Sequence, residues 1–553
     1  MPGVKLAPPS CDFLPPPITR FHLQHIARPA NRLSAVLTAA RVKELAVPAL
    51  LAAGLGLRLW YVWALKWNAP NADEAVAGLM AMHIAEGKEL PVFFYGQHYF
   101  GALEPYLNAL LFRLAGLAPN LIYAFPVLFS LALVWLGYRI ALSTYGGDVA
   151  VLSAALLSLA PAAFLFYALS AGGGFALAAL LQLAAIWLFA QAYHARIGGW
   201  RVAAAFGLIS GLLFWVWQLY MLLFVAFVLA WILGRRPIRL RASVAGFVPF
   251  VLGSFPLWLD NVRTHGATFS DGLGKFAGNF VIHRASLSGN LAPAAATGSA
   301  QGPLATVVAF ADSLIQRRQA YAYMGEWLGD VILVLLVACG VLLYIYYAQR
   351  RSRERDINLT LLLVSLVLLA IGHALRYLIV VPFLLIPCAV SGWRRLLGRG
   401  ASIIVFVAIV ANLLTVQQTI LHTFARDEWE PALTALQRNH LEFGYSDYWD
   451  AYPITFLSHE EVIVTALLRT PAGGRSDRYP KYATMVHSDV VGRAGMAFVL
   501  IPDDSPDRAA VFGPAAGPSC NAMRQSIPEL QATLCWPVAG FAIQNGVLTR
   551  LAR

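Results

Sequence analysis

The sequence predicts a polytopic α-helical membrane protein with a small α/β or α+β domain near its C-terminal end, and two observations support this fold class. Of the 553 residues, 59% are hydrophobic and only 13% are charged, with a mean hydropathy of +0.63. Soluble domains carry about 25% charged residues, so composition argues against a soluble enzyme. Apolar segments also recur along the first three quarters of the chain, each long enough to cross a hydrocarbon core about 30 Å thick.

These apolar segments predict about 11 transmembrane helices. Only Gln218 and Tyr220 suggest a break between the fifth and sixth predicted spans, so a single long helix is the alternative there. A single helix would reverse the predicted orientation of every later segment. The predicted spans lie near residues 45–66, 120–142, 149–168, 174–194, 201–218, 220–234, 242–260, 329–348, 357–373, 376–392 and 400–421.

The arginines between these spans predict the orientation. With a cytoplasmic N-terminus, the inner loops are YHARIGGWR, GRRPIRLRAS, AQRRSRERD and GWRRLLGRG. Arginine-rich loops on the cytoplasmic side are typical of membrane proteins. We therefore expect the loop after the first span, the segment 261–330 and the C-terminal part on the exported side. The net charge of +12 is explained by topology and lipid headgroups, and no nucleic-acid partner is predicted.

Three regions are expected along the chain. Residues 1–44 lack the apolar core of a signal peptide and are predicted to be a largely disordered cytoplasmic tail. Residues 45–421 form the membrane domain, and residues 422–553 form the exported (periplasmic) domain. Runs such as VIVTALL, AFVLIP and GVLTRL in the last region favour strands, and DEWEPALTALQRNH has helical spacing. Cys520 and Cys535 form either a disulfide or two reduced thiols.

The first exported loop, NADEAVAGLMAMHIAEGKELPVFFYGQHYFGALEP, has an unusual number of acids and histidines for so apolar a chain. Asn71 is predicted to cap a helix that begins at ADEAV, with Glu74 as the acid of a capping box. A second helix is expected over 103–114, with Pro105 in its first turn. Both helices are predicted to lie in the membrane interface with an apolar face downward.

Asp73 and Glu74 are the candidate catalytic acids of this loop. Acids at a helix N-terminus are favoured by the backbone dipole, so a purely structural role is the alternative for both. Their position a few residues beyond the first span favours catalysis, because a carboxylate there meets both a lipid-borne group and an aqueous acceptor.

Several other residues are candidates for substrate binding. Arg376 and Tyr377 lie at the exported end of a predicted span, where arginine binds phosphate or simply reaches the interface. Arg263 and His265 lie in the long loop, which is either a lid or a connector. In the first loop, His98 and Tyr99 are predicted to contact substrate.

Other features have competing interpretations. A divalent metal such as Mg or Mn could be bound by four residues of the first loop: Glu74, Glu104, His98 and Tyr99. Their spacing matches no metal motif, so no cofactor is firmly predicted. Arg58, inside the first span, is expected to have a bundle-internal or snorkelling role, with a catalytic role as the alternative. The aromatic and acidic cluster 445–452 either contacts sugar or packs against the membrane domain.

A family resemblance joins these elements. The first loop, the stretch APAAFLFYALSAGGGFALAALL, the stretch HALRYLIVVPFLLIP and the segment FGYSDYWDAYPITFLSHEEVIV together resemble the GT-C superfold of polyprenyl-phosphate-sugar-dependent glycosyltransferases, which includes aminoarabinose transferases and protein mannosyltransferases. The resemblance implies an inverting transfer with Asp73 as general base and Glu104 as a second acid. The sequence ALEP departs from the FEKPP-like wording of the aminoarabinose enzymes, and the lysine expected there for the donor phosphate is missing.

The predicted function is therefore a hexosyl- or pentosyltransferase of the cell envelope, mannosyltransferase-like, in a bacterial inner membrane. Its donor would be a polyprenyl-phosphate-linked sugar, and its acceptor a lipid, a glycan or a protein. A transporter or flippase for a lipid-linked glycan is the alternative, and a noncatalytic scaffold is a third hypothesis. Ionisable groups in mid-membrane would favour transport.

Overall fold

A computed structural model of the chain describes residues 28–193, 199–218, 221–233, 240–270, 379–422, 429–469, 476–492, 497–508, 511, 523–538, 541–544 and 547–550. The predicted spans 329–348 and 357–373 lie outside these residues. The chain divides into two units, residues 1–48 and 49–553. Helix α1 (Arg28–Leu65) begins in the first unit, so part of the segment predicted as a disordered tail is helical.

Apolar helices follow one another through the second unit. Four helical stretches of the described residues are long and apolar enough to cross a membrane, and up to six are if each bent pair counts as one span. Besides α1, the helices are α4 (Ala124–Tyr145), α5 (Gly147–Ser158), α6 (Ala162–Ala168), α7 (Phe175–Tyr193), α8 (Trp200–Val216), α9 (Met221–Leu233), α10 (Leu240–Gly253), α11 (Phe255–Arg263), α16 (Val381–Leu397) and α17 (Ala401–His422), with 3₁₀ turns at Pro119–Tyr123 and Gly398–Gly400.

Two predicted continuous spans are broken, which corrects the sequence expectation. The span predicted at 149–168 consists of α5 and α6, bent by 77°, and the span at 242–260 consists of α10 and α11, bent by 58°. Pro161, immediately before α6, fixes φ and cannot donate a helical hydrogen bond, so the first helix stops before it.

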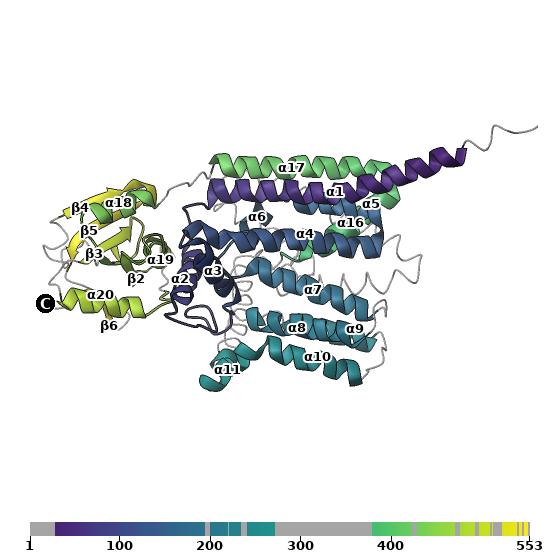
Figure 1. Cartoon of the computed structure of the whole chain (residues 1–553). Coiled ribbons are helices and arrows are strands. Elements are labelled where there is room, and N and C mark those ends of the chain that lie inside the picture. The colour runs from purple at the N-terminus through teal and green to yellow at the C-terminus, as the bar shows by residue number, and fades with distance from the viewer. Residues whose placement is uncertain are drawn as a thin grey trace, which may run out of the picture. The chain divides into compact units, whose positions relative to one another are not determined.

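The helices α4, α7, α8 and α10 lie side by side in sequence order (Figure 1). The contact between α8 and α10 depends on glycine: a Cβ added to Gly207 would lie 1.9 Å from the carbonyl oxygen of Gly246. Small residues allow such close backbone approach between apolar helices.

The first loop forms the two predicted helices, α2 (Ala72–Glu86) and α3 (Leu103–Ala115). Asn71 and Glu74 form the expected capping box, since each side chain bonds the other residue's backbone N–H. Nearly every residue from Ala72 to Ile84 is buried, so α2 lacks the exposed apolar face that was expected, and its placement in the membrane interface stays a prediction. Helix α2 packs against α3 and against α19 of the C-terminal part, so it has no open face.

The C-terminal part contains a five-stranded mixed sheet with the order β2-β1-β3-β5-β4. Strand β1 pairs in parallel with β2 and β3, and β5 is antiparallel to both β3 and β4. Strand β3 is buried along its whole length, as a continuous apolar run predicts. The elements are α18 (Glu430–Arg438), β1 (Phe443–Ser446), α19 (Tyr448–Leu457), β2 (Ile463–Ala466), α20 (Lys481–Gly492), β3 (Ala497–Pro502), β4 (Met523–Ile527), β5 (Ala532–Val538), and the separate hairpin β6 (Phe541–Gln544) and β7 (Val547–Arg550).

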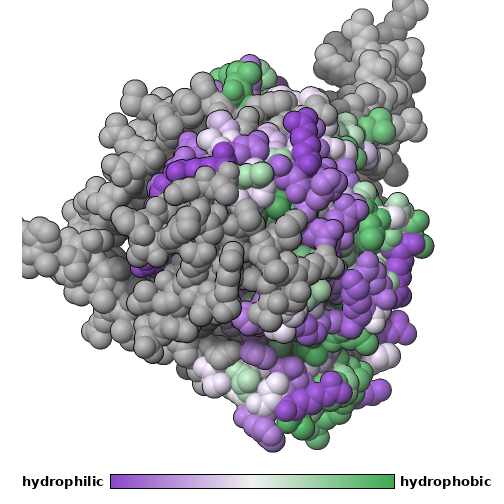
Figure 2. All heavy atoms as spheres, turned by 90° about the vertical axis from the view of Figure 1, so that its left-hand side faces the viewer, coloured by the Kyte–Doolittle hydropathy of each residue, from purple (hydrophilic) through white to green (hydrophobic). Residues whose placement is uncertain are grey.

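Seen from the end at which this sheet lies, most of the described surface is hydrophilic (Figure 2). Cys535, buried on β5, is disulfide-bonded. Cys520, the predicted partner, lies outside the described residues, so that pairing stays a prediction.

Candidate functional site

Asp73 lies in the first turn of α2, where the helix dipole favours its negative charge. Its side chain is only partly buried. Oδ1 accepts a hydrogen bond from the hydroxyl of Tyr448, the first residue of α19. Burial raises the pKa of Tyr448, and the charge of Asp73 raises it further, so Tyr448 stays a protonated donor. Within the described part of the chain, Oδ2 of Asp73 has no hydrogen bond.

Arg478 lies beside this pair. Its guanidinium is 5.6 Å from the centre of the Tyr448 ring. When the amide of Gln97 is oriented with its oxygen toward Arg478, both terminal nitrogens of the arginine donate to it at 2.6 Å. Among the described side chains no carboxylate pairs with Arg478, and its Nε is buried without a hydrogen-bond partner. A cation that has no carboxylate partner within the described residues thus lies next to Tyr448.

Glu74, the neighbouring acid, is surrounded by donors. Its side chain is 1% exposed, and its Oε1 lies 2.6 Å from Nζ of Lys66. Lys66 follows the last residue of α1. It also accepts hydrogen bonds from the hydroxyl of Tyr123 at 3.0 Å and from the backbone N–H groups of Asn71 at 3.1 Å and Ala171 at 3.3 Å. These contacts favour a structural and electrostatic role for Glu74.

Glu104, the predicted second acid, lies in the first turn of α3 and is buried. Neither of its carboxylate oxygens has a hydrogen-bond partner, nor do the side-chain atoms of Asn108, one turn further along α3. Burial raises the pKa of Glu104 well above its ordinary value, and the negative charge of Glu74 raises it further. The two acids are therefore close enough to interact.

The remaining predicted site residues either have other neighbours in the structure or lie outside the described residues. His98 faces α11, with its Nδ1 3.7 Å from Asp260. Tyr99 is partly buried against the apolar core. Arg263 and His265, at and just beyond the end of α11, are exposed. The predicted phosphate-binding residues Arg376 and Tyr377 lie outside the described residues.

A metal site is not assembled from the described residues. No three of their His, Cys, Asp or Glu side chains converge as a metal-binding group. Glu74 is already neutralised by Lys66, and His98 points toward α11. The predicted donor set therefore does not fit a divalent ion.

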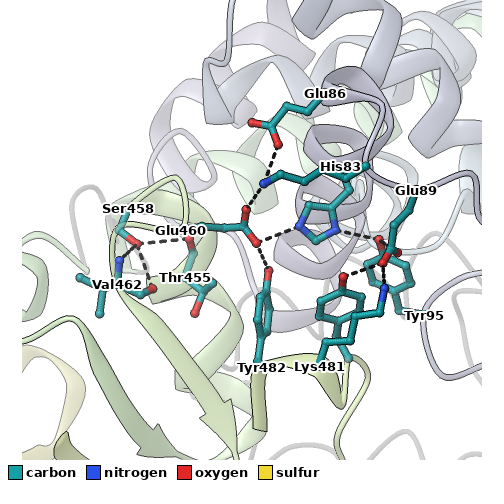
Figure 3. A network of polar contacts seen from close by, with 12 residues as sticks. His83, Glu86, Glu89, Tyr95, Thr455, Ser458, Glu460, Val462, Lys481 and Tyr482 are labelled. Carbon is teal, nitrogen blue, oxygen red and sulfur yellow. Dashed lines mark hydrogen bonds and ion pairs between the residues drawn. The ribbon is translucent and has the colours of Figure 1, made fainter. Parts of the chain in front are cut away.

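A polar network joins α2 to the C-terminal sheet (Figure 3). The imidazole of His83 on α2 lies 2.8 Å from both the hydroxyl of Tyr95 and Oε1 of Glu460. Tyr482 donates to the same oxygen of Glu460 at 2.8 Å, and Lys88 donates to its other oxygen at 2.9 Å. Glu89, the other carboxylate of this network, accepts hydrogen bonds from Tyr95 and Tyr479 at 2.7 Å and from Lys481.

Contact between apolar groups supports the same junction. A Cβ added to Gly78 on α2 would lie 2.4 Å from the ring of Phe456 on α19. Only glycine permits α19 to approach α2 this closely. The position of Tyr448 over Asp73 therefore depends on a joint that both polar and apolar contacts define.

The fold formed by these elements is similar to the folds of ArnT and of an archaeal oligosaccharyltransferase. No family model and no curated protein sequence matches the chain. ArnT from Cupriavidus metallidurans, bound to undecaprenyl phosphate, is 14% identical with a TM-score of 0.56 and covers 88% of this chain and 97% of that one. An oligosaccharyltransferase from Archaeoglobus fulgidus, in complex with Zn and sulfate, is 14% identical with a TM-score of 0.52 and covers 83% of this chain and 68% of that one. At such identities the likeness establishes the fold.

Sequence reasoning missed three residues of this site. Tyr448 was visible only as part of the 445–452 cluster, and Lys66 and Arg478 were not distinguished from other basic residues. Nothing in the local sequence links Tyr448 to Asp73, because 375 positions separate them.

Proposed function

We propose that this chain is an inverting glycosyltransferase that moves a sugar from a polyprenyl-phosphate donor to an acceptor at the exported face of a bacterial inner membrane. The observation that supports this best is the state of Asp73: one oxygen is held by Tyr448 and, within the described part of the chain, the other is without a hydrogen bond. A carboxylate that is oriented but not neutralised suits a general base.

In the proposed reaction, Oδ2 of Asp73 accepts the proton of an acceptor hydroxyl. The acceptor oxygen attacks the anomeric carbon, and the bond from that carbon to the phosphate oxygen breaks. The lipid phosphate leaves with the bonding electrons, and one displacement inverts the anomeric configuration. The hydroxyl of Tyr448 keeps the carboxylate in position, and Arg478 is the candidate cation to balance charge on the leaving phosphate.

Ligands of the solved structures support a lipid-carried donor. ArnT was crystallised with undecaprenyl phosphate, and AglB from Archaeoglobus fulgidus was determined with dolichol-phosphate and an inhibitory peptide. We propose a hexosyl or pentosyl donor of the same lipid class and leave lipid, glycan and protein acceptors open. The protein mannosyltransferases and aminoarabinose transferases are the relatives that the sequence resembles.

The Asp73→Asn variant tests the base. We expect transfer from a radiolabelled polyprenyl-phosphate sugar to fall by about 10²–10⁴-fold, the usual contribution of a general base. The control is Glu430→Gln, which changes an exposed acid in the first turn of α18 and should keep full activity. Both variants must be present in membranes at wild-type amounts. Full activity of Asp73→Asn would refute the proposed role.

Reporter fusions test the orientation. A phosphatase fused after Arg553 should be active in the exported compartment, because the loop containing Asp73 and the C-terminal part are predicted to share that side. Cytoplasmic activity of the fusion would place Asp73 on the wrong face and overturn the proposed site.

One observation favours the alternative of a transporter: an arginine is buried within α1. Arg58, however, donates to Ser130 and to the carbonyl groups of Gly54, Leu157 and Ser158. A cation occupied by these groups fits helix packing better than ion translocation. Movement of a lipid-linked sugar across proteoliposomes at the same rate in wild type and Asp73→Asn would favour transport instead.

A further inference from the structure

Helix α3 buries two polar side chains next to apolar ones and exposes two leucines. Leu110 and Leu114 are 53% and 75% exposed, whereas Glu104 and Asn108 are 2% and 0% exposed. Glu104 and Asn108 are four residues apart, so they lie on one face of the helix, one above the other. The inward face therefore holds Glu104 and Asn108 together with apolar side chains such as Phe112.

All four polar side-chain atoms of Glu104 and Asn108 are buried without a hydrogen-bond partner. A buried polar group without a partner costs about 1–3 kcal/mol, and native proteins retain few such groups. Two adjacent residues with every polar atom unsatisfied indicate that a ligand with several hydrogen-bonding groups completes them.

The pair lies beside the start of α7 and the end of α8. A Cβ added to Gly174, which precedes α7, would lie 3.6 Å from Oε2 of Glu104 and 3.9 Å from Val216, the last residue of α8. Gly174 has a φ of +60°, a conformation that favours glycine, so the backbone passes the carboxylate without a side chain between them. The pair thus lies where two apolar helices of the candidate membrane domain meet α3.

The pair also lies near the proposed base, because one short glycine loop contacts both. A Cβ added to Gly172 would lie 2.8 Å from Cβ of Asp73, and a Cβ added to Gly174, two residues further on, would lie 3.6 Å from Oε2 of Glu104. A group bound to Glu104 and Asn108 would therefore lie within the same part of the structure as the reacting bond.

We propose that Glu104 and Asn108 form a subsite that binds hydroxyl groups of the donor sugar. This inference rests on the proposed glycosyl transfer. A sugar hydroxyl both donates and accepts a hydrogen bond, and the amide of Asn108 complements it with a donor and an acceptor, while the carboxyl of Glu104 adds acceptors and, when protonated, a donor. Glu104 is thereby assigned to sugar binding, in place of the second-acid role that the family resemblance implies.

Apolar replacements separate binding from structure. In Asn108→Leu and Glu104→Leu, the unpaired polar atoms are removed, so the free protein should unfold at the same or a higher temperature. The matched control is Gln182→Leu: Gln182 on α7 is also fully buried with both amide atoms unpaired, but it lies within the span Phe175–Ala192. All three variants should gain or keep stability, and only the two on α3 should lose sugar binding.

The measurement is thermal unfolding in detergent with no ligand, with undecaprenyl phosphate, and with undecaprenyl phosphate that carries glucose or mannose. We expect the wild type and Gln182→Leu to be stabilised more by a sugar-bearing lipid than by the bare lipid phosphate. In Asn108→Leu and Glu104→Leu the bare lipid phosphate should stabilise as before. The sugar-dependent increment should disappear, which corresponds to an affinity at least about 10-fold weaker.

Three results would overturn the inference. A sugar-dependent increment that survives in both α3 variants would show that Glu104 and Asn108 serve another role, such as binding the acceptor. A wild type that responds equally to bare and sugar-bearing lipid has no sugar subsite of this kind, although its lipid-phosphate site would stand. A wild type that responds to neither lipid would remove the proposed donor as well.

Discussion

At the residue scale, Glu74 and Lys66 form a buried ion pair next to the proposed base. Glu74 accepts hydrogen bonds from Lys66, Asn71, Tyr123 and Ala171, and the ammonium of Lys66 also lies 5.6 Å from the centre of the Tyr123 ring. The pair neutralises one of two adjacent acids. The acid next to Asp73 in the sequence is therefore already paired with a cation.

Removing only the lysine of this pair should be costly. Lys66→Met leaves the carboxylate of Glu74 buried without its cation, and we expect a loss of about 3–5 kcal/mol of stability. The double variant Lys66→Met/Glu74→Gln should recover most of that loss, as measured by thermal unfolding in detergent. Sugar transfer by the stable double variant would show that Glu74 has a structural role. A double variant that is stable but inactive would show that Glu74 takes part in catalysis.

At the scale of elements, the break between α5 and α6 is stabilised by side chains from distant helices. Arg58 on α1 donates to the carbonyl oxygens of Leu157 and Ser158, and Asn412 on α17 donates to that of Leu159 at 2.9 Å. Water cannot reach backbone groups in the hydrocarbon region, so a bent helix there needs such internal partners. The bend turns α6 and the following glycine loop toward α2, where Ala171 meets Glu74.

Arg58→Leu tests this account of the bend. We expect a loss of about 1–3 kcal/mol for each carbonyl group left unpaired. Asn412→Leu should have a smaller effect, since it removes one donor. Differential scanning fluorimetry of the two purified variants would measure both. An Arg58→Leu protein as stable as wild type would show that the bend does not depend on this side chain.

At the scale of the whole molecule, the first loop and the C-terminal part are joined by direct contacts at the proposed site. Asp73 comes from α2, and Tyr448 and Arg478 come from the C-terminal part. The network of His83, Glu460 and their neighbours holds these two regions together (Figure 3). Geometry at the proposed base therefore depends on contacts that lie outside the reacting groups.

This junction should weaken in acid. Burial by itself would raise the pKa of Glu460, but hydrogen bonds from His83, Lys88 and Tyr482 outweigh it and lower the pKa to about 2, from an ordinary 4.5. A carboxyl group with a lowered pKa stabilises the folded state fully above its unfolded pKa. Its contribution is then lost as the pH falls from about 4.5 to about 2.

Unfolding temperature measured against pH checks this expectation. Glu460→Gln should be less stable than wild type at neutral pH and should lose the part of the slope below pH 4.5 that Glu460 contributes. The matched control is the exposed neighbour in Glu461→Gln, which should follow the wild-type curve. Identical pH curves for wild type and Glu460→Gln would show that this carboxylate does not couple the two regions.

Local signals in the sequence determined where the two helices of the first loop start. The capping box at Asn71 and Glu74 and the proline in the first turn of α3 were predictable because they involve residues three or fewer positions apart. Apolar runs identified the membrane class for the same reason, since hydropathy is a property of contiguous residues. The number of spans was harder to predict, because helix breaks such as the one at 159–161 interrupt neither the composition nor the length of an apolar run.

The sequence by itself therefore determined a membrane protein of this fold class, with capped helices in its first loop and an acid at residue 73. Only the tertiary structure decided what surrounds each acid. Tyr448 meets Asp73 across 375 positions, Lys66 neutralises Glu74, and Glu104 is left unpaired beside Asn108. Charge state and hydrogen bonding depend on neighbours in space, and packing between distant segments sets those neighbours.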